Sequence, residues 1–187
     1  MDRKKIETAV TMILEAIGEN PEREGLKDTP RRISAMCEEI FSGTVQNAAD
    51  ALNIFFEAEG DDPVAVNGIP FHSMCEHHLL PFFGTVSVIY LPRDRKITGL
   101  SKIARVVESA ARRPQIQENM TAQIADAIVD KLNPLGVLVT VRAEHLCMSM
   151  RGIRKQGSST MTLAARGIYR SDDALRREAL MLTNDPK

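Results

Sequence analysis

Two short segments, 75–78 and 145–147, concentrate the chain's metal-binding side chains. They read Cys-Glu-His-His and His-Leu-Cys, and they hold three of the four histidines and two of the three cysteines. Thiolate and imidazole are the protein ligands that zinc prefers. If the fold brings the two segments together, they form a metal site with histidines to spare. Histidines that are not needed as ligands can transfer protons, so the pattern indicates a catalytic site.

The spacing within each segment predicts how the side chains point. Cys75 and His78 are three residues apart, so a single turn can direct both at one ion. His145 and Cys147 are two apart, so we expect both on one face of a strand. His77 and His78 are adjacent and cannot easily point the same way, so we expect one to bind the metal and the other to face the substrate. Two thiolates and one imidazole leave a fourth zinc position for water, as in catalytic sites.

The same residues allow a structural alternative. His145 could serve as a fourth ligand and close a Cys2His2 site, although the paired C-x-x-C pattern that would favour it is absent. A chance grouping of buried cysteines and surface histidines is disfavoured because the residues cluster twice. The third cysteine, Cys37, lies on the apolar stripe of an expected helix, and we interpret it as a small buried hydrophobic residue.

The composition is typical of a soluble globular protein and limits the classes of partner. Hydrophobic residues make up 43% and charged residues 26% of the 187 residues, enough for one ordinary domain with its own core. A net charge of −1 provides no basic field for nucleic acid or an anionic membrane, so a polyanionic ligand needs a local cluster of Lys and Arg. No apolar run approaches the length of a membrane span. An odd number of cysteines without framework spacing favours a reducing compartment, so we expect a cytoplasmic protein.

The hydrophobic periodicity predicts an α+β fold with antiparallel strands. Residues 1–53 form the expected helical N-terminal region, and residues 54–187 form the expected α+β catalytic domain. Helices are expected at 6–17, 120–132 and 172–182. Two further helices are expected to begin at the N-caps Thr29 and Ser101 and to end at residues 41 and 110. Strands are expected at 84–91, 137–145 and 158–169.

Polar and basic residues in several places could bind an anionic nucleotide. Ser101, Lys102 and Arg105 stand at an expected helix start, where exposed amides and the helix dipole favour phosphate. Glu118, in a polar group with Gln115 and Gln117, could accept two N–H donors from a guanine-like edge, although such a group is also typical of a helix N-terminus. The remaining basic candidates are Arg31, Arg32, Arg151 and Arg154.

Four long motifs and one shorter segment match a known family. They read His-Ser-Met-Cys-Glu-His-His-Leu-Leu-Pro-Phe at 72–82, Gly-Leu-Ser-Lys-Ile-Ala-Arg-Val at 99–106, Arg-Pro-Gln-Ile-Gln-Glu at 113–118, His-Leu-Cys-Met with Arg-Gly at 145–152, and Asp-Thr-Pro-Arg-Arg at 28–32. In these motifs the chain closely resembles the GTP cyclohydrolase I family, and the resemblance covers nearly the whole chain. It departs from the family at Ala35, where a basic residue is frequent, and at Asn119, where an arginine commonly follows the glutamate.

The resemblance implies a fold, an assembly and a reaction. The fold would be the tunnelling fold, in which antiparallel strands from several subunits form a barrel with helices outside. The assembly would be a homo-oligomer, commonly a toroidal homodecamer with active sites at subunit interfaces. The reaction would convert GTP and water to 7,8-dihydroneopterin triphosphate and formate, the first step of tetrahydrofolate and pterin biosynthesis.

Where the chain matches the family's motifs, the resemblance also implies roles for individual residues. Cys75, His78 and Cys147 would bind one zinc ion per subunit, and His77 and His145 would be the acid–base groups. Seven further residues would contact the substrate: Glu118 and the backbone near Gln117 at guanine, Ser101 near the ribose, Lys102, Arg105 and Arg151 at the triphosphate, and Arg32, from a neighbouring subunit, over the phosphates.

Three other functions compete with this one. A zinc nucleoside deaminase would carry His-x-Glu followed by Pro-Cys-x-x-Cys, and the chain contains neither pattern. A relative of the same fold could use a cysteine nucleophile without metal, with Cys75 or Cys147 as the modified thiol. A purine-binding or metal-storage assembly would hold a structural zinc ion without turnover.

Overall fold

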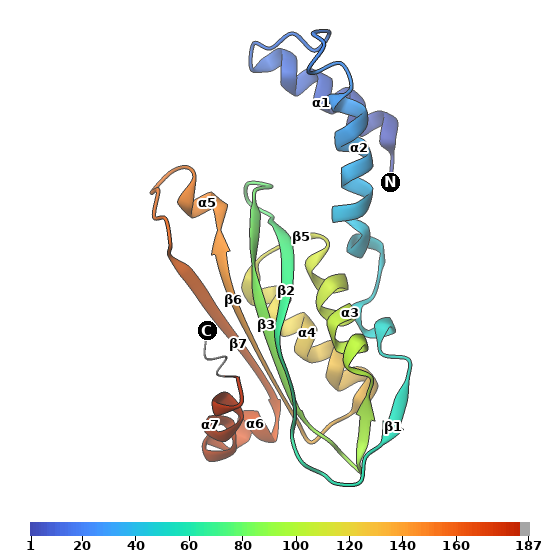
Figure 1. Ribbon diagram of the computed structural model, residues 1–187, viewed down its shortest axis with the longest axis vertical. Helices are drawn as coiled ribbons and strands as arrows, with labels where there is room; N and C mark the ends of the chain where they lie inside the picture. The colour runs from blue at the N-terminus through green and yellow to red at the C-terminus, as the bar shows by residue number, and fades with distance from the viewer. Residues whose placement is uncertain (184–187) are drawn as a thin grey trace. The chain divides into compact units, whose positions relative to one another are not determined.

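A computed structural model of the chain describes residues 1–183, which form two compact units, Met1–Ser42 and the remainder from Gly43 (Figure 1). None of the helices in this described part is long and apolar enough to cross a membrane. Residues 184–187, at the end of the expected catalytic domain, lie outside the described residues.

The first unit is a pair of helices, α1 (Arg3–Ala16) and α2 (Thr29–Ile40), which pack against each other. Asp2 caps α1 by accepting a hydrogen bond from the backbone N–H of Lys5 at 3.0 Å. Arg3 on α1 forms an ion pair with Glu38 on α2. The two helices predicted for this region are therefore confirmed.

The N-cap of α2 is Asp28, and the expectation that Thr29 is the cap was wrong by one residue. The carbonyl of Asp28 accepts a hydrogen bond from Arg32 N at 3.0 Å, so Thr29 is already helical and Pro30 follows it in the first turn. The carboxylate of Asp28 makes no capping hydrogen bond. It forms exposed ion pairs with Arg31 and Arg32, at 3.8 and 3.5 Å.

The second unit is built on a five-stranded sheet with the strand order β5–β2–β3–β6–β7. Its long strands pair antiparallel: β2 (Val64–Cys75), β3 (Pro81–Leu91), β6 (Gly136–His145) and β7 (Ser159–Gly167). The short β5 (Pro114–Gln115) runs parallel to the end of β2, and a separate small sheet pairs β1 (Phe55–Glu57) with β4 (Lys96–Thr98). The chain is thus a mixed α+β protein, as predicted.

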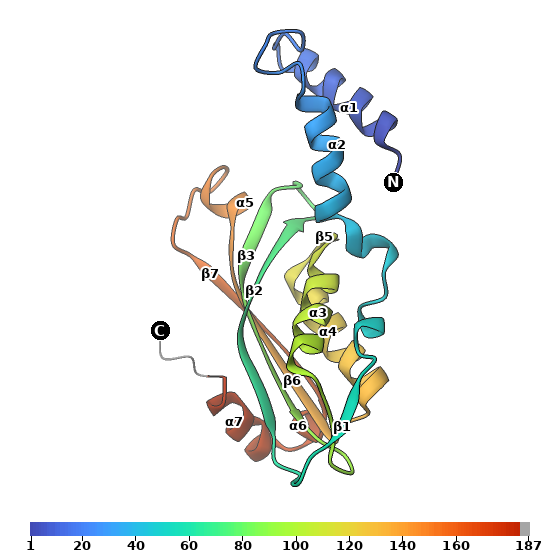
Figure 2. The same ribbon diagram turned by 45° about the vertical axis from the view of Figure 1, so that its right-hand side comes forward.

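Helices cover the two faces of the sheet unequally (Figure 2). On one face, α3 (Leu100–Ala111) and α4 (Gln117–Leu132) enclose the main apolar core. On the other, α6 (Ile168–Ser171) and α7 (Asp173–Met181) cover Ile89 and Leu138 in a second, smaller cluster. Two short turns, η1 (Ser42–Val45) and η2 (Ala48–Ala51), precede the sheet, and η2 packs against α3 and α4.

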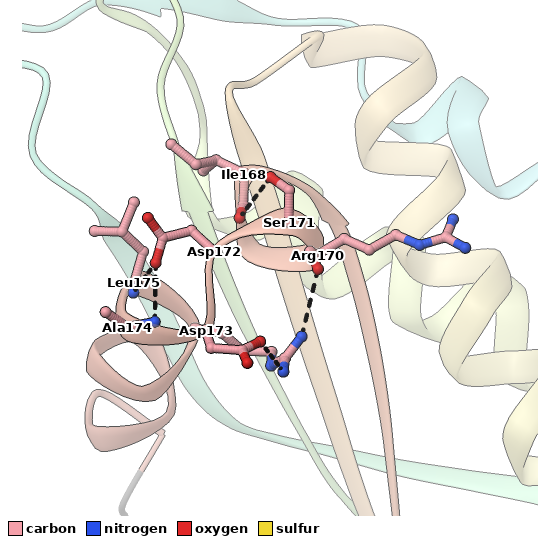
Figure 3. A network of polar contacts seen from close by, with 8 residues as sticks. Ile168, Arg170, Ser171, Asp172, Asp173, Ala174 and Leu175 are labelled. Atoms are coloured by element: carbon pink, nitrogen blue, oxygen red, sulfur yellow. Dashed lines mark hydrogen bonds and ion pairs between the residues drawn. The ribbon is translucent and has the colours of Figure 1, made fainter.

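Short polar contacts hold the corner between α6 and α7 (Figure 3). The carboxylate of Asp172 accepts hydrogen bonds from the backbone N–H groups of Ala174 and Leu175, at 2.9 and 3.0 Å, and so caps α7. The strand expected at 158–169 ends earlier than predicted, at Gly167, whose φ of 59° turns the chain into α6.

Strand β2 was not predicted from the sequence. It contains Gly68 and Pro70, two residue types that weaken a strand pattern. The structure accommodates them with an irregularity in the β2–β3 register between Val66 and Ile69, where Gly68 has a φ of 66°. Beyond this bulge the pairing continues regularly to the end of the strand.

The starts of α3 and α4 also differ from the prediction. Gly99 is the N-cap of α3, and Lys102 N bonds to Gly99 O at 2.8 Å, so Ser101 already lies within the first turn. The expectation that Ser101 is the N-cap was therefore wrong. Helix α4 begins at Gln117, ahead of the predicted start at residue 120.

Gly84 sets the distance between β3 and β6. It pairs with Ala143, and a Cβ atom on Gly84 would lie 1.9 Å from the carbonyl oxygen of Arg142. Because that neighbour is backbone, Gly84→Ala must push the two strands apart. We expect it to lower the free energy of unfolding by about 1–3 kcal/mol, measured by chemical denaturation. Thr85→Ala, at the exposed next position, is the control, and equal stabilities of the two variants would contradict the prediction.

Candidate metal centre and active site

The structure brings the three predicted metal ligands together. One ligand atom each from Cys75, His78 and Cys147 lies within 4.8 Å of the others. Cys75 Sγ is 3.9 Å from His78 Nδ1. His77 Nδ1 lies 4.0 Å from the same sulfur, but His77 does not belong to this three-residue group. The group found among residues 1–183 therefore has the composition Cys2His, without His145 as a fourth member.

A tight turn after β2 directs His78 back towards Cys75. The carbonyl of Cys75 accepts hydrogen bonds from His78 N at 3.3 Å and from Leu79 N at 2.8 Å, and Cys75 N donates to Leu80 O at 2.8 Å. Leu79 has a φ of 50°, which is uncommon for a residue with a side chain and closes the turn. This local geometry agrees with the prediction that residues three apart can face one ion.

Cys147 reaches the group in a way that the sequence did not indicate. Strand β6 ends at His145, and residues Leu146–Ser149 form the short helix α5. The expectation that His145 and Cys147 share one face of a strand was therefore wrong. The helical turn carries the Cys147 sulfur towards Cys75.

The two segments meet because strand β3 pairs with both of the strands that carry them. Phe82 on β3 lies opposite Ser73 on β2 and opposite His145 on β6. The ends of β2 and β6 consequently lie at the same edge of the sheet. Cys75 follows Ser73 by two residues on β2, and Cys147 follows His145 by two residues.

His145 is half-buried and held on two sides. Its ring stacks on that of Phe82, with centroids 4.7 Å apart and planes 1° from parallel. Its Nε2 atom lies 2.8 Å from Oε1 of Gln117. Burial lowers the pKa of His145, and the negative charge of Glu118 opposes this effect. His145 is therefore neutral at pH 7 and able to accept a proton.

The Cys147 thiol is held in its protonated form when no metal is bound. Burial raises its pKa, the neighbouring Cys75 raises it further, and the positive charge of Arg151 opposes both. Arg151 Nη1 also lies 3.2 Å from His78 Nε2. Arg151, one of the predicted triphosphate ligands, therefore lies directly beside the metal-binding group.

The residues predicted to bind guanine lie next to this group. Strand β5 pairs Gln115 with Cys75, and α4 starts two residues later with Gln117 and Glu118. Glu118 is exposed, whereas Gln117 is buried. The sequence suggested a role only for the backbone near Gln117. That its side chain contacts His145 was missed, as was the stacking of Phe82, because both depend on contacts between distant segments.

Three predicted substrate residues lie away from the metal-binding group. Ser101, Lys102 and Arg105 belong to the start of α3, which runs from β4 at its beginning to β5 at its end (Figure 1). The end of α3 adjoins the metal side, because Ser73 Oγ donates to Ala111 O at 2.7 Å. At 1.5 Å per residue, Ser101 is about 15 Å and Arg105 about 9 Å along the helix from Ala111. Among residues 1–183, none of the three belongs to the metal-binding group.

Arg32 lies in the first unit, on the first turn of α2. Its side chain is exposed and pairs with Asp28 in the same unit. Its predicted contact with phosphate stays a prediction.

The sequence profile of the family described as GTP cyclohydrolase I matches residues 6–184. The chain belongs to the GTP cyclohydrolase I family. Among its relatives, GTP cyclohydrolase 1 of Carboxydothermus hydrogenoformans is 58% identical over 182 residues, which are 97% of this chain and 95% of the relative. GTP cyclohydrolase 1 of Thermoanaerobacter pseudethanolicus is 54% identical over 187 residues, the full length of both chains. A solved structure of the archaeosine synthase QueF-Like in the apo form is 19% identical, with a TM-score of 0.45, and covers 59% of this chain and 97% of its own.

Membership in the GTP cyclohydrolase I family makes the chain an enzyme of the hydrolase class. The profile and the relatives identify the enzyme, and the fold independently gathers a Cys-His-Cys group that could bind zinc.

The two adjacent histidines provide a direct test of the ligand assignment. We expect His78→Ala to lose most of the bound zinc, because it removes one of three ligands. We expect His77→Ala to keep about one zinc per chain while turnover falls by about 100-fold or more, the usual contribution of an acid–base group. Metal analysis and rate measurements on both variants check this. Equal loss of metal in the two would show that the pair was assigned wrongly.

Zinc binding should release a proton from the thiol of Cys147. Because the raised pKa keeps the Cys147 thiol protonated at neutral pH and zinc binds thiolate, each zinc bound must displace at least one proton. The apparent zinc affinity should therefore rise with pH through the neutral range. Titration calorimetry in buffers of different ionisation enthalpy measures the proton count. A binding heat that is independent of the buffer would contradict the prediction.

Proposed function

We propose that this member of the family is zinc-dependent and converts GTP and water to 7,8-dihydroneopterin triphosphate and formate, the first step of tetrahydrofolate and pterin biosynthesis. The observation that carries the proposal is the convergence of Cys75, His78 and Cys147, with His77 and His145 adjoining them. The family assignment supports the substrate class. Three ligands with further histidines nearby are typical of a catalytic zinc site.

The donor set fits zinc. Two thiols and one imidazole suit Zn²⁺, whereas Mg²⁺ and Ca²⁺ prefer oxygen ligands. When bound, one zinc ion per subunit would supply a Lewis acid that lowers the pKa of water at the site. The thiol of Cys147, whose pKa is raised without metal, would lose its proton when zinc binds, because a bound metal ion favours the thiolate form.

The two remaining histidines would move protons. His145 is neutral at pH 7 because burial lowers its pKa, so it can take up a proton in one step and return it in the next. His77 is exposed beside Cys75 and would face the substrate. Opening of the imidazole ring of guanine and the later opening of ribose both need such proton transfers.

Recognition of the base would come from the start of α4. Glu118 is exposed there, and its carboxylate can accept hydrogen bonds from N1–H and the exocyclic amine of guanine. The backbone near Gln117 would add a further contact. Adenine presents no equivalent pair of donors, so this arrangement would favour GTP over ATP.

The triphosphate would be bound by residues from more than one chain. Arg151 lies beside His78 in the same chain, whereas Ser101, Lys102 and Arg105 stand at the far end of α3. We propose that a neighbouring copy supplies these three, with Ser101 near the ribose, and that Arg32 closes over the phosphates. Active sites at subunit interfaces would then account for their separation within one chain.

We also propose that the protein is a homo-oligomer, a toroidal homodecamer in the cytoplasm. Strand β7 lies at the edge of the sheet with one side unpaired among residues 1–183. Two large apolar side chains on it are exposed, Met161 at 51% and Leu163 at 44%. An exposed apolar edge strand is a template for pairing with another chain. Pairing between copies would extend the sheet towards the barrel of the tunnelling fold.

The proposed reaction has two products that can be measured separately. Zinc-loaded protein supplied with GTP should release formate and, after oxidation, a fluorescent pterin in equal amounts. ATP is the matched control substrate and should give neither. Absence of both products from GTP, despite about one zinc per chain, would refute the proposal. Undiminished turnover after complete metal removal would instead favour a cysteine nucleophile without metal.

A further inference from the structure

We propose that the side chain of Gln117 fixes the tautomer of His145, so that Nε2 carries the proton and Nδ1 is the atom that exchanges protons during the reaction. The inference rests on the proposed function, because it assigns a positioning residue to one of its two acid–base histidines. Gln117 is 2% exposed and projects from the first turn of α4 towards β6 and β7.

The orientation of the Gln117 amide follows from its neighbours. Its Nε2 atom lies 3.0 Å from Val141 O and 3.1 Å from Thr160 O. Both neighbours are backbone carbonyls, which only accept hydrogen bonds, so the amide nitrogen must face them. The flipped amide would set its oxygen against two carbonyl oxygens and leave the nitrogen without these acceptors. A buried amide in that state would cost the full desolvation of its groups.

The amide oxygen therefore faces His145. Oε1 of Gln117 lies 2.8 Å from His145 Nε2. An amide oxygen can only accept, so Nε2 must carry a hydrogen. A neutral imidazole has one N–H group, which leaves Nδ1 unprotonated. Among residues 1–183, Nδ1 has no hydrogen-bond partner, and the stacking on Phe82 restrains rotation of the ring.

Two threonine hydroxyls complete the network with one consistent direction. Thr121 Oγ1 donates to Gln117 O at 2.7 Å, so its only hydrogen is used. Thr162 Oγ1, 2.6 Å from Thr121 Oγ1, must then be the donor in that pair. Its lone pairs remain free to accept from Gln117 Nε2 at 3.1 Å. Three acceptors share the two hydrogens of Gln117 Nε2, and the directions of both hydroxyls agree with an amide oxygen that faces His145.

A positioning role has a specific chemical consequence. If Nε2–H is committed to Gln117, proton uptake by His145 occurs at Nδ1, and loss of that proton restores the same tautomer. Without the amide oxygen, both tautomers become accessible, and only one presents a free lone pair at Nδ1. Turnover should then fall with the population of the correct tautomer, while zinc and substrate binding change little.

Two buried glutamines allow a matched comparison. Gln117→Met keeps side-chain length and removes the acceptor for His145. Gln115→Met makes the same change at a residue that is 3% exposed and bonds Ala110 O and Gln123 Oε1 without contacting His145. Both variants lose a buried amide, so a purely structural effect should appear in both.

The test is ¹⁵N NMR of zinc-loaded, histidine-labelled full-length protein, with His145→Asn used to identify the signals of His145. In the unmodified chain we expect a protonated Nε2 and an unprotonated Nδ1. In Gln117→Met we expect a mixture of tautomers and a fall in kcat of about twofold, as two equally populated tautomers give, with KM and zinc content nearly unchanged. In Gln115→Met the His145 signals should be unaltered.

A proton on Nδ1 together with an unprotonated Nε2 in the unmodified chain would overturn the proposal, as would Gln117→Met with unaltered His145 signals and kcat. If Gln117→Met does not fold, the tautomer of His145 in the unmodified chain and in Thr162→Val still tests the proposal. In Thr162→Val the amide nitrogen keeps its two carbonyl acceptors, so Nε2–H should persist, and a changed tautomer would contradict the network. If the unmodified chain makes no product from GTP, the proposed function is refuted. The NMR spectrum still shows which nitrogen of His145 carries the proton.

Discussion

The pairing of β3 with β2 on one side and β6 on the other is the constraint on which the site depends. Phe82 lies opposite Ser73 and His145, so the register places the ends of β2 and β6 side by side. A slip of one residue would turn every side chain of a strand to the opposite face. The buried core of the sheet therefore fixes the register, and the register brings together two groups of ligands that are distant in the chain. Gly84, two residues from Phe82, keeps the β3–β6 pair close enough to form it.

Much of the fold and of the candidate site follows from local sequence, and the remainder depends on distant contacts. The five longer helices, three of the long strands and the turn that joins Cys75 to His78 are set by neighbouring residues. Strand β2 escaped prediction because Gly68 and Pro70 interrupt its pattern, and pairing with β3 overrides that weakness. Cys147 was expected on a strand, because nothing in His-Leu-Cys signals that β6 stops at His145. The three side chains still meet, because the helical turn brings the sulfur of Cys147 to the other two.

Gln117 shows how one residue can serve the core and the site. A buried amide is costly unless its donors and acceptor are all bonded, and here they are, to β6, to β7 and to His145. The sequence alone cannot distinguish this glutamine from an exposed one, because its partners lie on strands that follow it in the sequence and are distant from it. The buried amide of Gln117 also gives the half-buried His145 ring one defined orientation. Stacking on Phe82 alone would allow the ring to turn over by 180°.

A single chain carries the metal-binding group but not every residue that the proposed reaction requires. The group and Arg151 lie at one edge of the sheet, whereas Ser101, Lys102 and Arg105 start a helix whose opposite end adjoins that edge. A helix is rigid over this distance, so no local rearrangement of α3 brings its first turn to its own metal ligands. We propose that a second copy supplies them to the same nucleotide. The exposed apolar residues on edge strand β7 provide a reason for copies to associate. Metal binding would then be a property of one chain, and nucleotide turnover a property of the assembly.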